Sequence, residues 1–235
     1  MKFSVLTSTV PDGNMSPAFE DSPETWANRE RFFKENGINP QRVASMKQIH
    51  SALIIETTDP IRHIGCDGLV TVDKTLWLSV AHADCMPLFF YSENPYILGA
   101  AHVGWKGLVS QLPLKMVEQF VKKGANLERI IVQGGPFICE KHYDVDLTDK
   151  RKDALPHVTL ESGKIGLDMR KETLQQLQEA GINSENIHLS PECTAEFPGR
   201  YSSYHVHRAA RHGAMVTAAG VQNVQEIRAP AGIAN

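Results

Sequence analysis

Runs of apolar residues, some alternating and some continuous, divide the chain into predicted strands joined by polar turns. These strands cover residues 3–9, 42–50, 52–58, 69–72, 75–81, 86–91, 96–102, 129–133 and 186–190. Strands 75–81, 86–91 and 96–102 are almost entirely apolar, which predicts central strands covered on both faces. A sheet with a buried interior is therefore the main feature expected of the fold.

Helical periodicity follows or separates these strands in three places, over residues 23–36, 111–123 and 169–180. Ser22 and Pro23 are suited to begin the first helix, and Gly37 is placed to end it. Three segments lack a clear period, and they are residues 146–162, 193–212 and 226–235. The first gives a helix little support, the second predicts a loop and the third predicts a loose tail.

Strands that alternate with a few helices predict an α/β fold with mixed β-sheet layers and flanking helices, in a single domain over residues 1–235. The composition, with 42% hydrophobic and 22% charged residues, is that of a globular protein. A net charge of −3 gives no electrostatic case for nucleic acid or an acidic membrane. The sequence shows neither a secretory signal nor an apolar run near the roughly 20 residues of a membrane helix.

Cysteine spacing points to a reducing compartment. The four cysteines, Cys66, Cys85, Cys139 and Cys193, are widely separated and form no C-x-x-C pair. A disulfide framework is rare in a chain of this size, so we expect a cytoplasmic protein with free thiols.

Candidate chemistry gathers in the strand-rich half of the chain, at His50, His82, Asp84, Cys85 and His102. A thiolate and imidazoles can bind zinc or form a nucleophile and its base, and spacing alone supports both. Asp67 lies in the predicted turn Gly65-Cys66-Asp67-Gly68. It would either stabilise this turn or support such a site. Four cations could bind an anion, although surface charge is the commoner role of each: Lys106, Arg200, Arg208 and Arg211.

Five motifs then occur in order: Lys47-Gln48-Ile49-His50, Asp67-Gly68-Leu69-Val70-Thr71, Ala83-Asp84-Cys85-Met86-Pro87-Leu88, Ala101-His102-Val103-Gly104-Trp105-Lys106-Gly107 and Gly135-Pro136-Phe137-Ile138. With weaker similarity around Asp168 and Cys193-Thr194, the chain resembles the YfiH-like family. That family was long labelled laccase-like polyphenol oxidases and is now associated with purine nucleoside phosphorylase and adenosine deaminase activity.

The resemblance implies one catalytic zinc held by His50, Cys85 and His102, with copper as the older alternative. It also implies purine nucleoside and phosphate as substrates, and a fold similar to the cysteine-hydrolase-like fold of deamidating toxins. Five residues would then contact substrate, namely Lys47, Gln48, Lys106, Arg208 and Arg211. His82, Asp84 and Asp67 would contact the ligands without binding the ion themselves.

Two positions depart from the family pattern. His82 stands where most relatives have threonine, so it would add a fourth ligand or a supporting group. Relatives also carry Ser-Tyr-Arg-Arg near the C-terminus, where this chain has Ser203-Tyr204-His205-Val206. If the missing arginines hold phosphate in the relatives, we expect this chain either to bind it through Arg208 or Arg211 or to bind it poorly.

Three other functions fit parts of the pattern. A thiol hydrolase or amidase would use Cys85 as nucleophile and His102 as base. Copper-dependent phenol oxidation ranks low, because His205-x-His207 is the only H-x-H pair and a multicopper oxidase needs several. A non-enzymatic cell-wall-maintenance factor with a vestigial metal site is the third.

Overall fold

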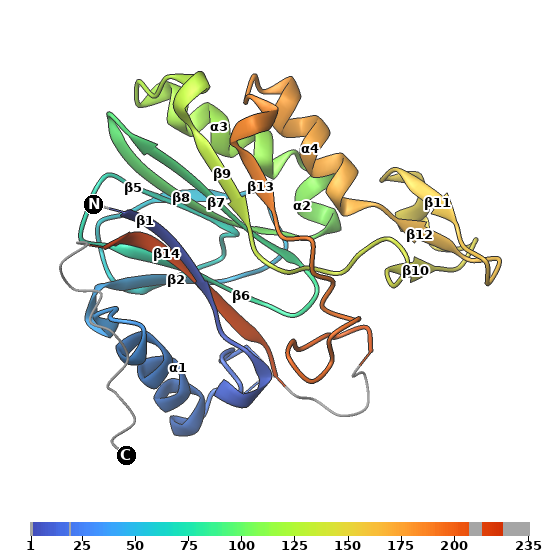
Figure 1. The fold of residues 1–235 in the computed structure, drawn as a ribbon, viewed down its shortest axis with the longest axis horizontal. Coiled ribbons are helices and arrows are strands. Elements are labelled where there is room, and N and C mark those ends of the chain that lie inside the picture. Colours follow the sequence, from blue (N-terminus) through green and yellow to red (C-terminus); the bar gives the residue numbers. More distant parts are fainter. Residues whose placement is uncertain (1, 19, 207–212, 223–235) are drawn as a thin grey trace, which may run out of the picture.

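Two β-sheets packed face to face form the centre of the protein, with helices on their outer faces (Figure 1). The computed structural model describes residues 2–18, 20–206 and 213–222. The predicted α/β class with mixed sheet layers and flanking helices is confirmed. Within the described ranges, no helix has the length and apolar character needed to cross a membrane.

The first sheet has five strands and contains the chain's first and last described elements. Its strands in spatial order are β1 (Lys2–Thr7), β14 (Met215–Gln222), β6 (Trp77–His82), β2 (Val43–Lys47) and β4 (Arg62–Ile64). The second sheet has six strands, β13 (Ile187–Leu189), β9 (Ile131–Gly134), β7 (Met86–Glu93), β8 (Tyr96–Val103), β5 (Gly68–Thr71) and β3 (Ile54–Glu56). A small third sheet contains β10 (Asp144–Val145), β12 (Ile165–Leu167) and β11 (His157–Thr159).

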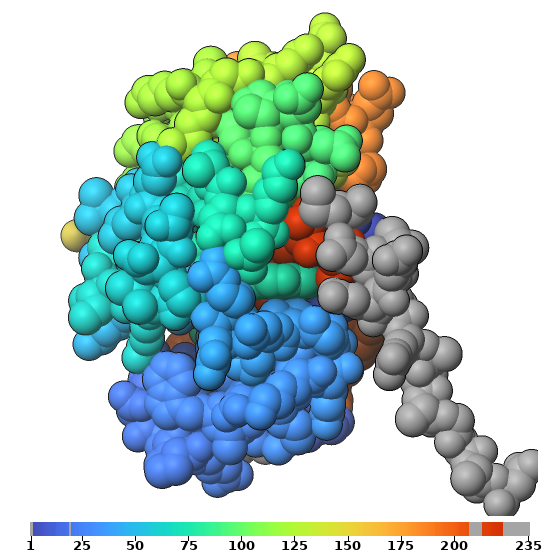
Figure 2. Space-filling model, turned by 90° about the vertical axis from the view of Figure 1, so that its left-hand side faces the viewer, coloured from blue at the N-terminus to red at the C-terminus, as the bar shows by residue number. Residues whose placement is uncertain are grey.

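Helices cover the outer face of each large sheet. The helix α1 (Pro23–Glu35) packs on the five-stranded sheet, and α2 (Trp105–Val109), α3 (Leu112–Lys122) and α4 (Met169–Glu179) lie on the side of the six-stranded sheet. In Figure 2 the blue N-terminal segment lies at the bottom and the yellow-green segment around α3 at the top, with cyan and green segments between them. The start of α1 is as predicted, because the Ser22 side chain accepts a hydrogen bond from the Thr25 amide.

Alternation along the strands of the six-stranded sheet fills two separate cores. Leu69 and Phe89 pack between the two sheets, whereas their neighbours Val70 and Phe90 pack toward α3. The Phe90 ring centroid lies 6.0 Å from that of Phe120 on α3. Both faces of these strands are therefore buried, which explains their continuous apolar sequence.

Several predicted boundaries and one predicted element were wrong. The strands expected at 42–50 and 52–58 are only Val43–Lys47 and Ile54–Glu56, because the amides of residues 49–51 bond to a side chain instead of a strand. Residues 146–162 do not form the weakly supported helix. A 3-10 turn over Lys150–Asp153 and strand β11 form there, since pairing with β12 overrides local preference.

The strand β14 was not predicted at all, although it lies between β1 and β6 in the five-stranded sheet. Its middle is Ala218-Ala219-Gly220, and these residue types favour strands poorly. A Cβ on Gly220 would lie 2.3 Å from the ring of Trp77, so a glycine is needed where β14 passes that side chain. Tertiary packing rather than local pattern therefore selects this strand.

Candidate metal centre and pocket

The buried carboxylate of Asp67 holds together three segments that are far apart in the sequence. It accepts hydrogen bonds from the backbone amides of Ile49 at 3.1 Å, His50 at 3.0 Å and Ser51 at 2.6 Å, and from the Ser51 hydroxyl at 2.8 Å. A further bond of 2.9 Å joins it to Nδ1 of His102. Burial raises the pKa of Asp67, but the bonds from His102 and Ser51 outweigh burial and lower this pKa to about 2. The group is therefore ionised at neutral pH.

His50 is presented from the loop after β2 in a left-handed backbone conformation. Its φ is 59°, which is uncommon for a residue other than glycine. The three amide bonds to Asp67 stabilise this turn and so offset its backbone strain. As a result the exposed His50 ring is directed toward the end of β8, where its centroid lies 4.9 Å from that of His102.

His102 lies at the buried end of β8, and its ring orientation is fixed by Asp67. With the Nδ1 proton donated to that carboxylate, Nε2 faces away from Asp67 and toward Cys85, an arrangement typical of metal-binding histidines. Burial lowers the pKa of His102, whereas the charge of Cys85 and the bond to Asp67 raise it, with the net result at about 9. In the metal-free protein the imidazole is therefore paired with a thiolate.

Cys85 lies in the turn from β6 to β7, where the chain passes from one large sheet to the other. Its Sγ is 4.0 Å from Nε2 of His50. Burial raises the pKa of this thiol, but the charge and hydrogen bond of His102, with a smaller effect of His50, lower it to about 6. The predicted nucleophile or ligand is thus largely ionised at neutral pH.

Asp84 places Cys85 and does not itself join the ligand group. Its φ of 89° makes the sharp turn. Its carboxylate accepts bonds from Thr194 Oγ1 at 2.6 Å and from the His205 amide at 2.7 Å, and its carbonyl accepts one from the Ile138 amide at 3.0 Å. Two later segments of the chain therefore support the turn that carries Cys85.

The donor atoms of His50, Cys85 and His102 all lie within 4.8 Å of one another, so these residues fit a metal ion. Gly104 gives the group room, because a Cβ there would lie 2.9 Å from Cys85 Sγ and 3.3 Å from the His50 ring. One thiolate and two imidazoles suit zinc, and three protein ligands leave a fourth position for substrate or water. The structure therefore contains a candidate Cys/His metal site at the residues that the sequence suggested.

A pocket of about 390 Å³ opens beside this group. Its wall includes all three candidate ligands together with Gln48, His82, Asp84, Trp105, Tyr143, Tyr204, His205 and the arginines Arg29, Arg62 and Arg151. A volume of this size is within the range of small-molecule sites. The arginines were not among the predicted contacts. Arg62, for example, reaches the pocket only because β4 pairs with β2, a long-range contact that has no local signal.

Other predicted site residues are placed in different ways. His82 lines the pocket but is not in the ligand group, and its Nε2 lies 2.8 Å from Thr217 Oγ1. Gln48 also lines the pocket, and both ends of its amide bond to the backbone of Ala81. Lys47 and Lys106 are exposed and are not part of the pocket wall. Two predicted phosphate contacts, Arg208 and Arg211, lie outside the described residues, as do His207 and the tail at 226–235.

The chain is similar to known proteins in sequence and in structure. Residues 4–222 match a family described as multi-copper polyphenol oxidoreductase laccase. A purine nucleoside phosphorylase of Deinococcus radiodurans is 32% identical over 187 residues, covering 78% of this chain and 73% of the relative. Another, from Staphylococcus epidermidis, is 28% identical over 176 residues, which cover 71% of this chain but only 64% of the relative. The crystal structure of YlmD from Geobacillus stearothermophilus superimposes with a TM-score of 0.87 at 25% identity, covering 94% and 92% of the two chains.

Replacing Asp67 with Asn should weaken both metal binding and folding. The change removes the negative charge that orients His102. It also replaces a carboxylate oxygen, which accepts hydrogen bonds, with an NH2 group that would face N–H donors. We expect metal affinity to fall about 10- to 100-fold. The free energy of unfolding should fall by about 3 kcal/mol. Chelator competition and urea denaturation measure the two effects, with the exposed Asp59→Asn as control. Unchanged metal affinity in folded Asp67→Asn would contradict the role assigned to this carboxylate.

The H-x-G-W-K-G motif offers a matched pair of glycine variants. A Cβ at position 104 would lie too close to Cys85 and His50. The nearest atom to a Cβ at position 107 is in Leu112, at the ordinary contact distance of 3.5 Å. Gly104→Ala should therefore weaken metal binding by about 1–3 kcal/mol, and Gly107→Ala should leave it near the parent value. Isothermal titration of the metal-free proteins with zinc tests this difference. Equal affinities of the two variants would refute the packing argument.

Proposed function

Since the chain belongs to the YfiH-like family, whose model is described as multi-copper polyphenol oxidoreductase laccase, we propose that it is a zinc-dependent purine nucleoside phosphorylase that also deaminates adenosine. The observation that carries the proposal is the group His50, Cys85 and His102 in the wall of a pocket of about 390 Å³. The names of the relatives support the phosphorylase activity. Deamination and the choice of zinc over copper rest on the family resemblance, because two imidazoles and a thiolate can also bind copper.

The proposed zinc site uses each residue in a distinct way. His50 Nε2, Cys85 Sγ and the Nε2 of His102 would hold the ion, and Asp67 keeps His102 in the tautomer that can bind it. When bound, zinc supplies Lewis acidity beside the pocket. Because His50 is exposed and His102 is buried, substrate would approach from the His50 side.

The rest of the pocket would bind the nucleoside. Trp105, Tyr143 and Tyr204 give it aromatic surface against which a purine base can pack. The Arg151 guanidinium lies over the Tyr143 ring, 5.6 Å from its centroid, and this contact fixes the position of the ring on that wall. Holding base and ribose in one orientation beside the ligand group lowers the entropic part of the barrier.

Phosphorolysis also needs an anion site, and Arg62 is our candidate for it. This half-buried guanidinium lines the pocket together with that of Arg29, which is buried and already bonded to the Met15 carbonyl and to Ser79. Burial and the charge of Arg62 lower the pKa of Arg29 to about 10, so the two cations repel each other. A phosphate between them would relieve that repulsion. Arg208 and Arg211 stay candidates, since His205 and Ala214 on either side of their segment line the pocket.

A thiol hydrolase is the second candidate, and the acidity of Cys85 favours it. A thiol with its pKa lowered to about 6 beside an imidazole also describes an activated nucleophile. In that case the Cys85 thiolate would attack the substrate directly, and His102, which has already taken the thiol proton as base, would donate it to the leaving group. The two functions differ in their need for metal.

Product analysis separates these functions. Zinc-loaded protein incubated with adenosine should give adenine only when phosphate is present, and inosine with or without it. Chromatography of the products, with chelator-treated protein as control, measures both reactions, and both should disappear without metal and return with zinc. Hydrolase activity that survives metal removal and is abolished by alkylation of Cys85 would instead support the second candidate. If copper-loaded protein oxidised phenols and turned over no nucleoside, the polyphenol oxidase activity named in the family description would be favoured instead.

The anion site is tested by Arg62→Gln. Loss of a charged hydrogen bond to phosphate costs about 1.5–3 kcal/mol. The KM for phosphate should therefore rise at least about tenfold, and the ratio of phosphorolysis to deamination should fall. Arg129→Gln, at an exposed position outside the pocket, is the control. An unchanged KM for phosphate would remove Arg62 from the proposal without affecting the metal site.

A further inference from the structure

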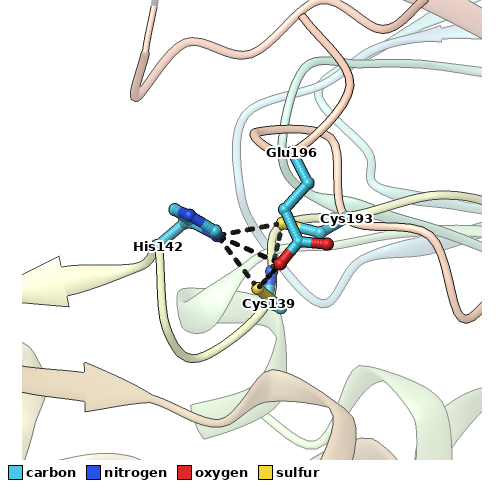
Figure 3. A group of neighbouring side chains, drawn as sticks. All are labelled: Cys139, His142, Cys193 and Glu196. Carbon is cyan, nitrogen blue, oxygen red and sulfur yellow. Dashed lines mark hydrogen bonds and ion pairs between the residues drawn. The ribbon is translucent and has the colours of Figure 1, made fainter. Parts of the chain in front are cut away.

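A second group of metal-binding side chains lies in two loops outside the first ligand group. Cys139 and His142 come from the segment between β9 and β10, and Cys193 and Glu196 come from the segment after β13. Figure 3 shows the four side chains directed toward one another. We propose that these four residues form a second metal site, a structural site for zinc or a similar thiophilic divalent ion.

The distances between the donor atoms suit one tetrahedral ion. Nδ1 of His142 lies 3.2 Å from Cys139 Sγ, 3.6 Å from Cys193 Sγ and 3.7 Å from the Glu196 carboxylate. The Cys139 sulfur lies 3.9 Å from the same carboxylate oxygen. A tetrahedron with metal-ligand distances of about 2.0–2.3 Å has edges of about 3.3–3.8 Å. These four separations are thus close to tetrahedral edges, and all four donor atoms lie within 4.8 Å of one another.

The backbone holds each pair of ligands in a tight turn. Both pairs are three residues apart, as C-x-x-H and C-x-x-E, and in each the amide of the last residue bonds to the carbonyl of its cysteine, at 3.1 Å for His142 and 3.2 Å for Glu196. The Cys139 amide also donates to Cys193 Sγ at 3.2 Å. A β-bridge between Phe137 and Cys193 joins the two turns. The ligands are therefore positioned before any ion binds.

The donor set also identifies the kind of ion and its role. Two thiols, an imidazole and a carboxylate favour zinc over hard ions such as magnesium or calcium. Four protein ligands complete the tetrahedron, and a site without an open position is structural. A disulfide between the two cysteines is the simpler alternative, but it gives no reason for the convergence of His142 and Glu196. Their side chains are 39% and 44% exposed, which leaves a path for the ion.

The position of this group suggests what the ion would stabilise. Ile138, next to Cys139, donates its amide to the Asp84 carbonyl, and Thr194, next to Cys193, donates its hydroxyl to the Asp84 carboxylate. Asp84 is the turn residue that presents Cys85. An ion held by both loops would fix these two supports relative to each other. The second site would therefore help to place the cysteine of the first.

Metal analysis of reduced protein tests the proposal. Metal-free protein, reduced and then loaded with zinc and desalted, should retain two equivalents per chain, one for each group. The double variant Cys139→Ser/Cys193→Ser should retain one, as should His50→Ala/Cys85→Ser. Cys66→Ala, which removes a buried cysteine outside both groups, is the control and should retain two. If the Cys139→Ser/Cys193→Ser variant retains as much zinc as the reduced parent protein, the proposal is overturned, whether or not the first group binds zinc.

Cobalt substitution gives a readout that is independent of catalysis. The two groups contain three cysteines, Cys85, Cys139 and Cys193, so two thirds of the thiolate-to-cobalt absorption should come from the second site. The Cys139→Ser/Cys193→Ser variant should lose that share. If this double variant does not fold, as judged by circular dichroism, His142→Ala keeps both thiols and should weaken cobalt binding at the second site only. Full cobalt absorption with unchanged affinity in His142→Ala would exclude the tetrahedral site.

Discussion

The organisation of this protein depends on one buried carboxylate. Asp67 receives five hydrogen bonds, from the three amides of residues 49–51, from the Ser51 hydroxyl and from the His102 ring. An ionised group in the interior is stable only when such partners compensate for its lost hydration. Here the partners are the loop that carries one candidate ligand and the ring of another. The requirement to satisfy a buried charge therefore also brings the candidate metal ligands together, and it ends strand β2 early.

The layered fold explains why the ligands meet where they do. Strand β6 belongs to the five-stranded sheet and β7 to the six-stranded sheet, so the turn between them crosses from one layer to the other. Cys85 lies in this turn, His102 lies at the end of the neighbouring β8, and His50 follows β2 of the first sheet. Apolar packing on both faces of β7 and β8 makes this junction rigid. A reactive group at such a junction has fixed geometry, whereas the pocket beside it stays open.

The sequence was sufficient for features that have a local or repeated signal. Strands β7 and β8 were predicted because burial on both faces leaves a continuous apolar run, and the ligand group was predicted because His50, Cys85 and His102 belong to ordered motifs. Features that depend on distant contacts were missed. Strand β14 contains weak strand formers and is selected by its packing on Trp77. Arg62 looks like a surface charge until β4 pairs with β2, and Cys139 meets Cys193 across 54 residues.

The part of the pocket wall formed by Tyr143 and His205 is connected to the turn of Cys85 through a continuous set of hydrogen bonds. Asp84 bonds to Thr194 and to the amide of His205, and the His205 ring bonds in turn to Asp144 at 2.6 Å. Tyr143, beside Asp144, faces the pocket. A shift of this wall would therefore move the turn that carries the thiolate as well as the surface that contacts a ligand. Because the pocket wall and the turn that carries Cys85 share these contacts, we expect substitutions at Thr194 or Asp144 to affect both, even though neither residue belongs to the first ligand group.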